Sequence, residues 1–164
     1  MAKSAENKTN VMRILDRKKI AYTAHTYPHE EGVAVDGVTV ARSMGQDPGK
    51  VFKTLVTRGA TGTYYVFDVP VAETLDLKKA AKAVQEKSVA MLPSKELLPL
   101  TGYVHGGCSP VGMKKQFQTV LHESAADYET IVVSGGKIGA QVELAPDDLL
   151  QLVRGITADV IVDA

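Results

Sequence analysis

The segment from residue 51 to residue 71, VFKTLVTRGATGTYYVFDVPV, constrains the fold of this chain more than any other part of the sequence. Two runs rich in β-branched and aromatic residues flank RGATG, whose two glycines suit a turn between strands. The segment therefore predicts a β-hairpin. An isolated hairpin is only marginally stable in water, so the rest of the chain must extend it into a sheet and cover it.

Segments on both sides of the hairpin change between helical and extended patterns in an irregular order. The apolar residues Val11, Ile14 and Leu15 recur at helical spacing, and Thr74 or Asp76 is expected to cap a later helix. Helices are predicted near residues 11–18, 38–44, 75–85, 94–100 and 146–154, and further strands at 21–27, 87–92, 118–123, 130–136, 138–144 and 158–162. This order favours a mixed sheet with flanking helices over a regular βαβ array.

Composition narrows the class of protein further. The chain has 164 residues, of which 45% are hydrophobic, and this is enough for one domain spanning residues 1–164 with a substantial core. Lys plus Arg and Asp plus Glu both number 19, so the chain lacks the basic excess of proteins that hold nucleic acid by charge alone. The polar N-terminus and the lack of a long apolar run predict a soluble, cytoplasmic protein with no membrane partner.

Lys53 is the most unusual residue of the predicted hairpin, because it stands in the apolar run VFKTLV. Strand alternation puts it on one face with Val51 and Leu55. One interpretation is an edge-strand lysine whose stem covers apolar surface while its ammonium group reaches water. The other is a lysine in a cleft, where an ammonium group needs an anion or a ligand oxygen as its partner.

Two glycine-rich stretches, HGGCSPVG and SGGKIG, provide the second candidate feature. In the first, Gly106 and Gly107 are adjacent, and Gly112 follows Ser109 and Pro110. Adjacent glycines let backbone N–H groups converge on an oxyanion or a phosphate. The alternative is a plain surface turn. Neither stretch matches a P-loop or a dinucleotide-binding fingerprint.

Cysteine and histidine residues offer weaker candidates. Cys108, the only cysteine, is near His105 in sequence, which raises the hypothesis of a thiol nucleophile with a base. A single free cysteine is more often a small buried apolar residue. The other histidines, His25, His29 and His122, show no metal-binding spacing, so we expect neither a metal nor a cofactor.

Five motifs in this order resemble the YbaK family of freestanding aminoacyl-tRNA editing proteins, which are related to the insertion domain of bacterial prolyl-tRNA synthetase. They are HTY, DPGKVFKTLV, LDLKKAAKA, TGYVHGGCSPVGMKK and YETIVVSGGKIGAQVELAPDDLL. The resemblance runs from about Val11 to the end of the chain. The forms FKTLV and GGCSPVG are similar to the Cys-tRNA(Pro) deacylase branch rather than the Ala-tRNA(Pro) branch.

This resemblance implies an α/β (α+β) fold with a mixed, partly barrel-like sheet surrounded by helices. It implies that Lys53 is the essential lysine and that the amides of the Gly106–Gly107 loop face the substrate. It also implies substrate contacts by a further set of residues: Tyr27, Thr54, Ser109, Pro110, Gly112, Gln141 and Asp148. Two positions depart from the family pattern: Asp36 replaces an aromatic residue, and Gln141 replaces a serine.

The implied reaction is cleavage of the ester between a wrongly attached cysteine and the 3′ end of tRNA. The implied partners are the aminoacyl-tRNA 3′ end and a complex with prolyl-tRNA synthetase. The residues leave open whether water or the substrate's own thiol attacks the ester. Three alternatives also stay open: a non-catalytic module that binds tRNA or the synthetase, an editing domain for Ala-tRNA(Pro), and a hydrolase that uses Cys108 with His105.

Overall fold

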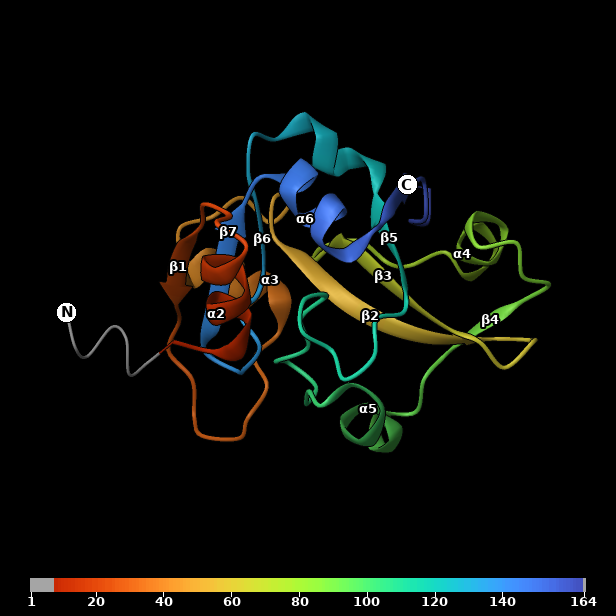
Figure 1. Cartoon of the computed structure of the whole chain (residues 1–164), viewed down its shortest axis with the longest axis horizontal. Helices are drawn as coiled ribbons and strands as arrows, with labels where there is room; N and C mark the ends of the chain where they lie inside the picture. The colour runs from red at the N-terminus through yellow and green to blue at the C-terminus, as the bar shows by residue number, and fades with distance from the viewer. Residues whose placement is uncertain (1–7, 164) are drawn as a thin grey trace.

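The computed structural model describes residues 8–163 and contains two β-sheets surrounded by helices (Figure 1). The helices are α2 (Asn10–Arg17), α3 (Gly37–Ser43), α4 (Leu77–Ala83), α5 (Ser94–Thr101), the 3₁₀-helix η1 (Glu123–Asp127) and α6 (Pro146–Val153). The strands are β1 (Thr23–Thr26), β2 (Phe52–Gly59), β3 (Tyr64–Pro70), β4 (Val89–Met91), β5 (Gln118–His122), β6 (Ile131–Ser134), β7 (Ala140–Leu144) and β8 (Ile156–Ala158). No helix within residues 8–163 is long and apolar enough to cross a membrane.

The predicted hairpin is confirmed as the antiparallel pair β2–β3 at the centre of a five-stranded sheet with the order β4-β2-β3-β5-β8. Because β5 runs parallel to β3 and β8 runs parallel to β5, the sheet is mixed, as expected. Thr54 lies directly opposite Asp68 in the hairpin register, and Lys53 lies opposite Val69. These pairs place Thr54 and Asp68 on one face of the sheet and Lys53 on the other.

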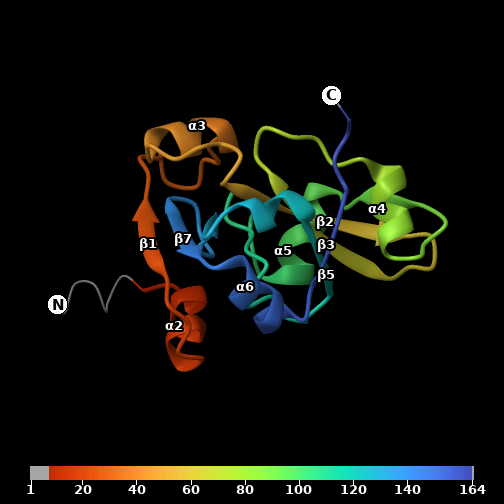
Figure 2. The ribbon, with the colours of Figure 1, turned by 90° about the horizontal axis from the view of Figure 1, so that it is seen from above.

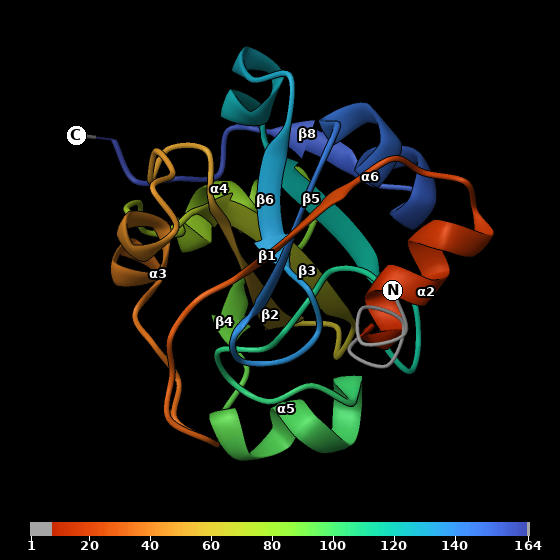
Figure 3. The ribbon, with the colours of Figure 1, turned by 90° about the vertical axis from the view of Figure 1, so that its left-hand side faces the viewer.

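The remaining strands form a separate antiparallel sheet with the order β1-β7-β6. A parallel bridge between Val51 and Val132 connects this small sheet to the start of β2. Figure 3 shows the small sheet crossing in front of the larger one, and Figure 2 shows α3 and α2 on its two opposite sides. The mixed sheet with flanking helices is thus as expected; its strands divide between two connected sheets, and no closed barrel forms among the described residues.

Local capping explains several helix boundaries. The Thr9 side chain accepts a hydrogen bond from the Met12 N–H at the start of α2, and Asp76, one of the two expected caps, accepts from two backbone N–H groups of α4. The last strand differs from the prediction: β8 covers Ile156–Ala158, whereas of the expected strand at 158–162 only Ile161 forms an additional bridge, to Leu75. Pairing with β5, rather than the apolar pattern, determines where this strand lies.

The edge of β2 that faces away from β3 is only partly paired with other strands. At its start Val51 bridges to β6, and further along the Val56 carbonyl accepts a hydrogen bond from the Leu92 N–H at 3.0 Å. Between these two positions no other strand within residues 8–163 pairs with this edge. The alternation of an antiparallel pair points the backbone N–H and C=O of Thr54 toward the same open edge.

Candidate functional site

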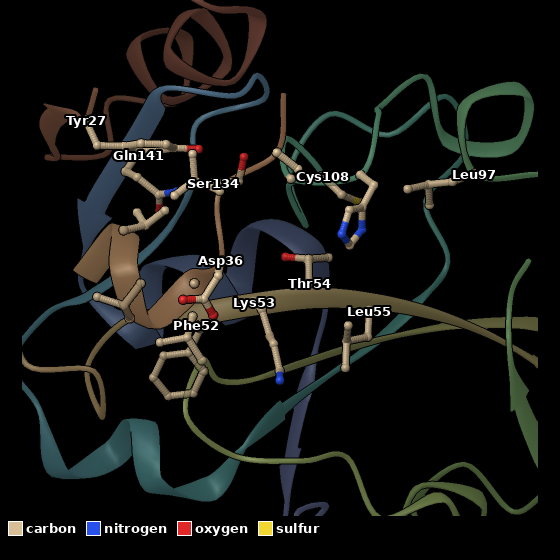
Figure 4. Close-up of a pocket in the computed structure, with 18 residues that line it drawn as sticks. Tyr27, Asp36, Phe52, Lys53, Thr54, Leu55, Leu97, Cys108, Ser134 and Gln141 are labelled. Atoms are coloured by element: carbon tan, nitrogen blue, oxygen red, sulfur yellow. The ribbon is translucent and has the colours of Figure 1, made fainter. Parts of the chain in front are cut away.

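A cavity of about 460 Å³ lies against the open edge of β2, within the size range typical of small-ligand sites. It is lined by residues from β2, from the segment before and within α3, from β6 and β7, and from the first glycine loop (Figure 4). The lining residues are Tyr27, Ala34, Val35, Asp36, Gly37, Val40, Val51, Phe52, Lys53, Thr54, Leu55, Val71, Leu97, His105, Gly106, Cys108, Ser134 and Gln141. Segments far apart in the sequence therefore meet at one pocket.

Lys53 lines this pocket as a partly buried side chain. Within residues 8–163 its ammonium group has no hydrogen-bond or ion-pair partner. Burial lowers the pKa of Lys53, and the negative charges of Asp36 and Glu73 partly oppose this shift. The lysine is thus a half-buried cation that can bind an anionic or strongly polar ligand oxygen.

Thr54 lines the pocket from the other side of β2 (Figure 4). Its hydroxyl group donates a hydrogen bond of 2.5 Å to Oδ1 of Asp68, which is fully buried under the pocket. Burial raises the pKa of Asp68 to about 7, and the hydrogen bond from Thr54 opposes that rise. The second carboxyl oxygen, Oδ2, is buried and has no hydrogen-bond partner in the described part of the chain, residues 8–163.

Sequence reasoning missed Asp68, although a signal was present. Its strand, YYVFDVP, is as apolar as the strand that holds Lys53, and a charged residue in such a run is unusual. The register of the hairpin, in which Asp68 lies opposite Thr54, is decided by the strand pairing.

The first glycine loop contributes less than expected. Gly106 lines the pocket, but Gly107 does not, and its N–H group donates to the Val104 carbonyl at 3.0 Å. A catalytic amide at Gly107 is therefore contradicted, because this N–H group is already used within the loop. The N–H groups of Gly106 and Cys108 have no such partner within residues 8–163.

Gly107 instead explains why the two glycine stretches come together. A Cβ atom at Gly107 would lie 2.9 Å from the backbone N of Ile138 and from Cα of Lys137. Such close approach of two backbones requires glycine. The first glycine loop therefore packs directly on the second, which lies between β6 and β7.

Four other expected substrate contacts lie outside the pocket. Ser109 and Pro110 are buried in the first loop and Gly112 is partly buried there; the Ser109 hydroxyl accepts from the Val111 N–H at 3.2 Å. A Cβ atom at Gly112 would lie only 2.8 Å from the Tyr103 hydroxyl oxygen. These three residues pack within the loop and do not line the pocket. Asp148 is in the first turn of α6 and also lies outside the pocket.

Tyr27 and Gln141, two of the expected substrate contacts, line the pocket. Tyr27 is held at the end of β1, where its N–H group donates to the Gly139 carbonyl at 3.1 Å. The Gln141 side-chain oxygen is buried and finds no hydrogen-bond partner among the residues that the structure describes. A buried acceptor without a partner is costly, so this oxygen is suited to a donor on a ligand.

Asp36 is also in the lining, and it has a structural role of its own. It caps α3, where its Oδ2 atom accepts from the Thr39 N–H at 3.1 Å and from the Thr39 hydroxyl at 2.6 Å. These hydrogen bonds lower the pKa of Asp36. An exposed carboxylate therefore stands at the rim of the pocket.

Cys108 and His105 both line the pocket, but the thiol is unsuited to nucleophilic attack. Burial, and secondarily the negative charge of Asp68, raise the pKa of Cys108 to about 12. A reactive cysteine needs its thiolate form near neutral pH. Cys108 therefore fits the interpretation of a buried, unreactive thiol.

Comparison with known proteins places the chain in a family. The aminoacyl-tRNA editing domain family matches residues 32–152. The chain is 45% identical over 158 residues to a protein of Enterococcus faecalis (strain ATCC 700802 / V583) that carries the provisional name Cys-tRNA(Pro)/Cys-tRNA(Cys) deacylase EbsC. The alignment covers 96% of each protein.

Solved structures agree with the fold. One, described provisionally as a trans-editing enzyme for prolyl-tRNA synthetase, has a TM-score of 0.78 and 26% identity, covering 93% of this chain and 95% of its own. Another, the hypothetical protein APE2540, has a TM-score of 0.83 and 20% identity, covering 94% of this chain and 100% of its own. At that identity, the second likeness shows the fold alone.

Proposed function

The chain belongs to the aminoacyl-tRNA editing domain family, and we propose that it is a trans-acting deacylase that removes cysteine from Cys-tRNA(Pro). The observation that carries this proposal is the half-buried ammonium group of Lys53, which has no partner within residues 8–163, in a pocket that also offers amide donors and a buried acceptor. The near full-length likeness to the deacylase-named relative supports the choice of substrate.

The pocket matches the parts of an aminoacyl ester. Lys53 can bind the phosphate or the ester oxygen that gains negative charge during cleavage. The free N–H groups of Gly106 and Cys108, together with the outward-facing N–H of Thr54, are further donors. The unpartnered oxygen of Gln141 and the carboxylate of Asp36 suit the α-ammonium group.

We infer that the substrate's own thiol attacks the ester carbonyl. The sulfur forms a bond to the carbonyl carbon, the bond to the ribose oxygen breaks, and the ribose oxygen takes up a proton. The product is a cyclic thiolactone. This route suits a pocket whose only thiol, Cys108, is held in its protonated form, because the enzyme then acts through orientation and electrostatics.

Editing is needed because cysteine and proline are similar in size. A synthetase pocket discriminates between such side chains by only about 10- to 200-fold. The formal net charge of the chain is zero, which favours weak, transient contact with tRNA. We propose that prolyl-tRNA synthetase, as a cytoplasmic partner, supplies the remaining specificity for tRNA(Pro).

The test is a deacylation assay on Cys-tRNA(Pro) with Lys53→Ala. We expect the rate to fall by about 100- to 1,000-fold, the usual loss when an oxyanion-stabilising group is removed. Lys87→Ala removes an exposed lysine that does not line the pocket, and it is the matched control. Circular dichroism of both variants confirms that the fold is retained.

Two outcomes would contradict the proposal. Full activity of Lys53→Ala would show that the lysine has no catalytic role. Binding of acylated tRNA by the wild-type protein without any shortening of the ester lifetime would identify a binding module instead. Parallel assays on Ala- and Ser-tRNA(Pro) measure amino-acid preference, and release of free cysteine from the start would argue for attack by water.

A further inference from the structure

The buried carboxyl group of Asp68 has no place in the mechanism described so far. It is fully buried on β3, directly opposite Thr54, and the hydroxyl of Thr54 is its only hydrogen-bond donor within residues 8–163. A carboxyl group in such a site destabilises the fold, and an apolar residue of similar volume would fit the core better. The arrangement therefore calls for a function.

The hydrogen bond to Asp68 determines what Thr54 offers to the pocket. A threonine hydroxyl has one hydrogen to donate and two lone pairs to accept with. Since the hydrogen is directed to Oδ1 of Asp68, only lone pairs remain for the pocket. When Asp68 is ionised, above a pH of about 7, its negative charge strengthens the Thr54 hydroxyl oxygen as an acceptor.

We propose that Asp68 is a positioning residue that makes the Thr54 oxygen the acceptor for the thiol S–H of the bound cysteinyl group. This inference rests on the proposed function and deepens it, because it assigns the recognition of the cysteine side chain to a particular pair of residues. Asp68 itself does not touch the substrate; it acts through Thr54.

The surroundings of Thr54 explain why the ligand group is the thiol rather than the α-ammonium. The thiol of Cys108 lies on the same side of β2 (Figure 4), and it is close enough to Asp68 for that carboxylate to affect its pKa. The apolar side chain of Leu97 also lines the pocket. A weakly polar group fits here, whereas the α-ammonium finds better acceptors in Gln141 and Asp36.

The experiment is a double-mutant cycle with Asp68→Asn and Thr54→Val, measured by kcat/KM for Cys-tRNA(Pro). Ala-tRNA(Pro), which lacks the thiol, serves as a competitive inhibitor that reports binding of everything else. We expect losses of about tenfold for Asp68→Asn and about 10- to 100-fold for Thr54→Val. The double variant should lose no more than Thr54→Val alone, because Asp68 acts only through Thr54.

Two further variants separate this role from a general structural one. Thr54→Ser keeps the hydroxyl and should retain most of the activity. Thr57→Val removes another buried hydroxyl of β2, which donates to the Tyr65 carbonyl outside the pocket, and should leave kcat/KM unchanged. In all variants the inhibition constant of Ala-tRNA(Pro) should stay within about twofold of wild type.

Additive losses in the double variant, or an equal weakening of Ala-tRNA(Pro) binding, would overturn the inference. If the wild-type protein deacylates Cys-tRNA(Pro) and Asp68→Asn is equally active, this inference is overturned while the proposed function stands. Absence of cysteine release by the wild-type protein would instead refute the proposed function, and this inference with it.

Discussion

Replacing Asp68 by asparagine should stabilise the protein above neutral pH. The carboxyl group is fully buried with one hydrogen-bond donor among the described residues, and this environment raises its pKa from 3.8 to about 7. One pKa unit equals about 1.4 kcal/mol, so the rise corresponds to about 4 kcal/mol of folding free energy. Asparagine has nearly the same shape and avoids this cost because it carries no charge.

The sign of the pH dependence follows from linkage. Below pH 4 Asp68 is protonated in both the folded and the unfolded chain, so its burial costs little. Between pH 4 and 7 the unfolded chain loses this proton while the folded chain keeps it, and the contribution of Asp68 to stability falls as pH rises. Above about pH 7 both states are charged and the full cost is present.

Urea denaturation followed by circular dichroism between pH 5 and pH 8.5 tests this reasoning. We expect the free energy of unfolding of Asp68→Asn to exceed that of wild type by about 2–4 kcal/mol at pH 8.5, and the excess to shrink steadily toward pH 5. A difference that does not change with pH, or a less stable variant at pH 8.5, would refute the argument. Together with the expected loss of activity, greater stability would mark Asp68 as a functional residue that costs stability.

Two other predictions concern the first glycine loop. Gly107→Ala should lower the free energy of unfolding by about 1–3 kcal/mol, because its Cβ would lie 2.9 Å from the backbone of the neighbouring glycine loop. Val104→Ala, at an exposed side chain, is the control. Equal urea midpoints for Gly107→Ala and the wild-type protein would contradict the packing role. Cys108→Ser should deacylate Cys-tRNA(Pro) at a rate within about threefold of wild type, because the buried thiol stays protonated. A loss as large as that expected for Lys53→Ala would restore Cys108 as a nucleophile.

Much of the fold could be predicted from local patterns. The β-rich runs around RGATG form the β2–β3 hairpin, and the helix boundaries at Asp76 and Pro146 follow from capping and from proline at the first turn. The division into two sheets could not be read in this way. Strand pairing joins residues far apart in the chain, and β8 lies where β5 provides an edge rather than where the apolar pattern is strongest.

The candidate site, too, could be predicted from the sequence only in part. Lys53 was recognisable because a cation in an apolar strand is costly in almost any fold. Gly106 and Gly107 look equivalent as neighbours in the sequence, yet only Gly106 lines the pocket, while the Gly107 N–H group is bonded to Val104. Which amide stays free depends on how the loop turns, and the sequence does not specify that.

The sequence by itself thus determined the central hairpin, the unusual lysine within it and the family resemblance, because these depend on the order and periodicity of nearby residues. Only the tertiary structure decided that the Thr54 hydroxyl donates a hydrogen bond to Asp68. It also decided that four of the expected contacts lie outside the pocket: Ser109, Pro110, Gly112 and Asp148. Burial and hydrogen-bond partners arise when distant segments pack together, and these two properties determine which polar groups remain available to a substrate.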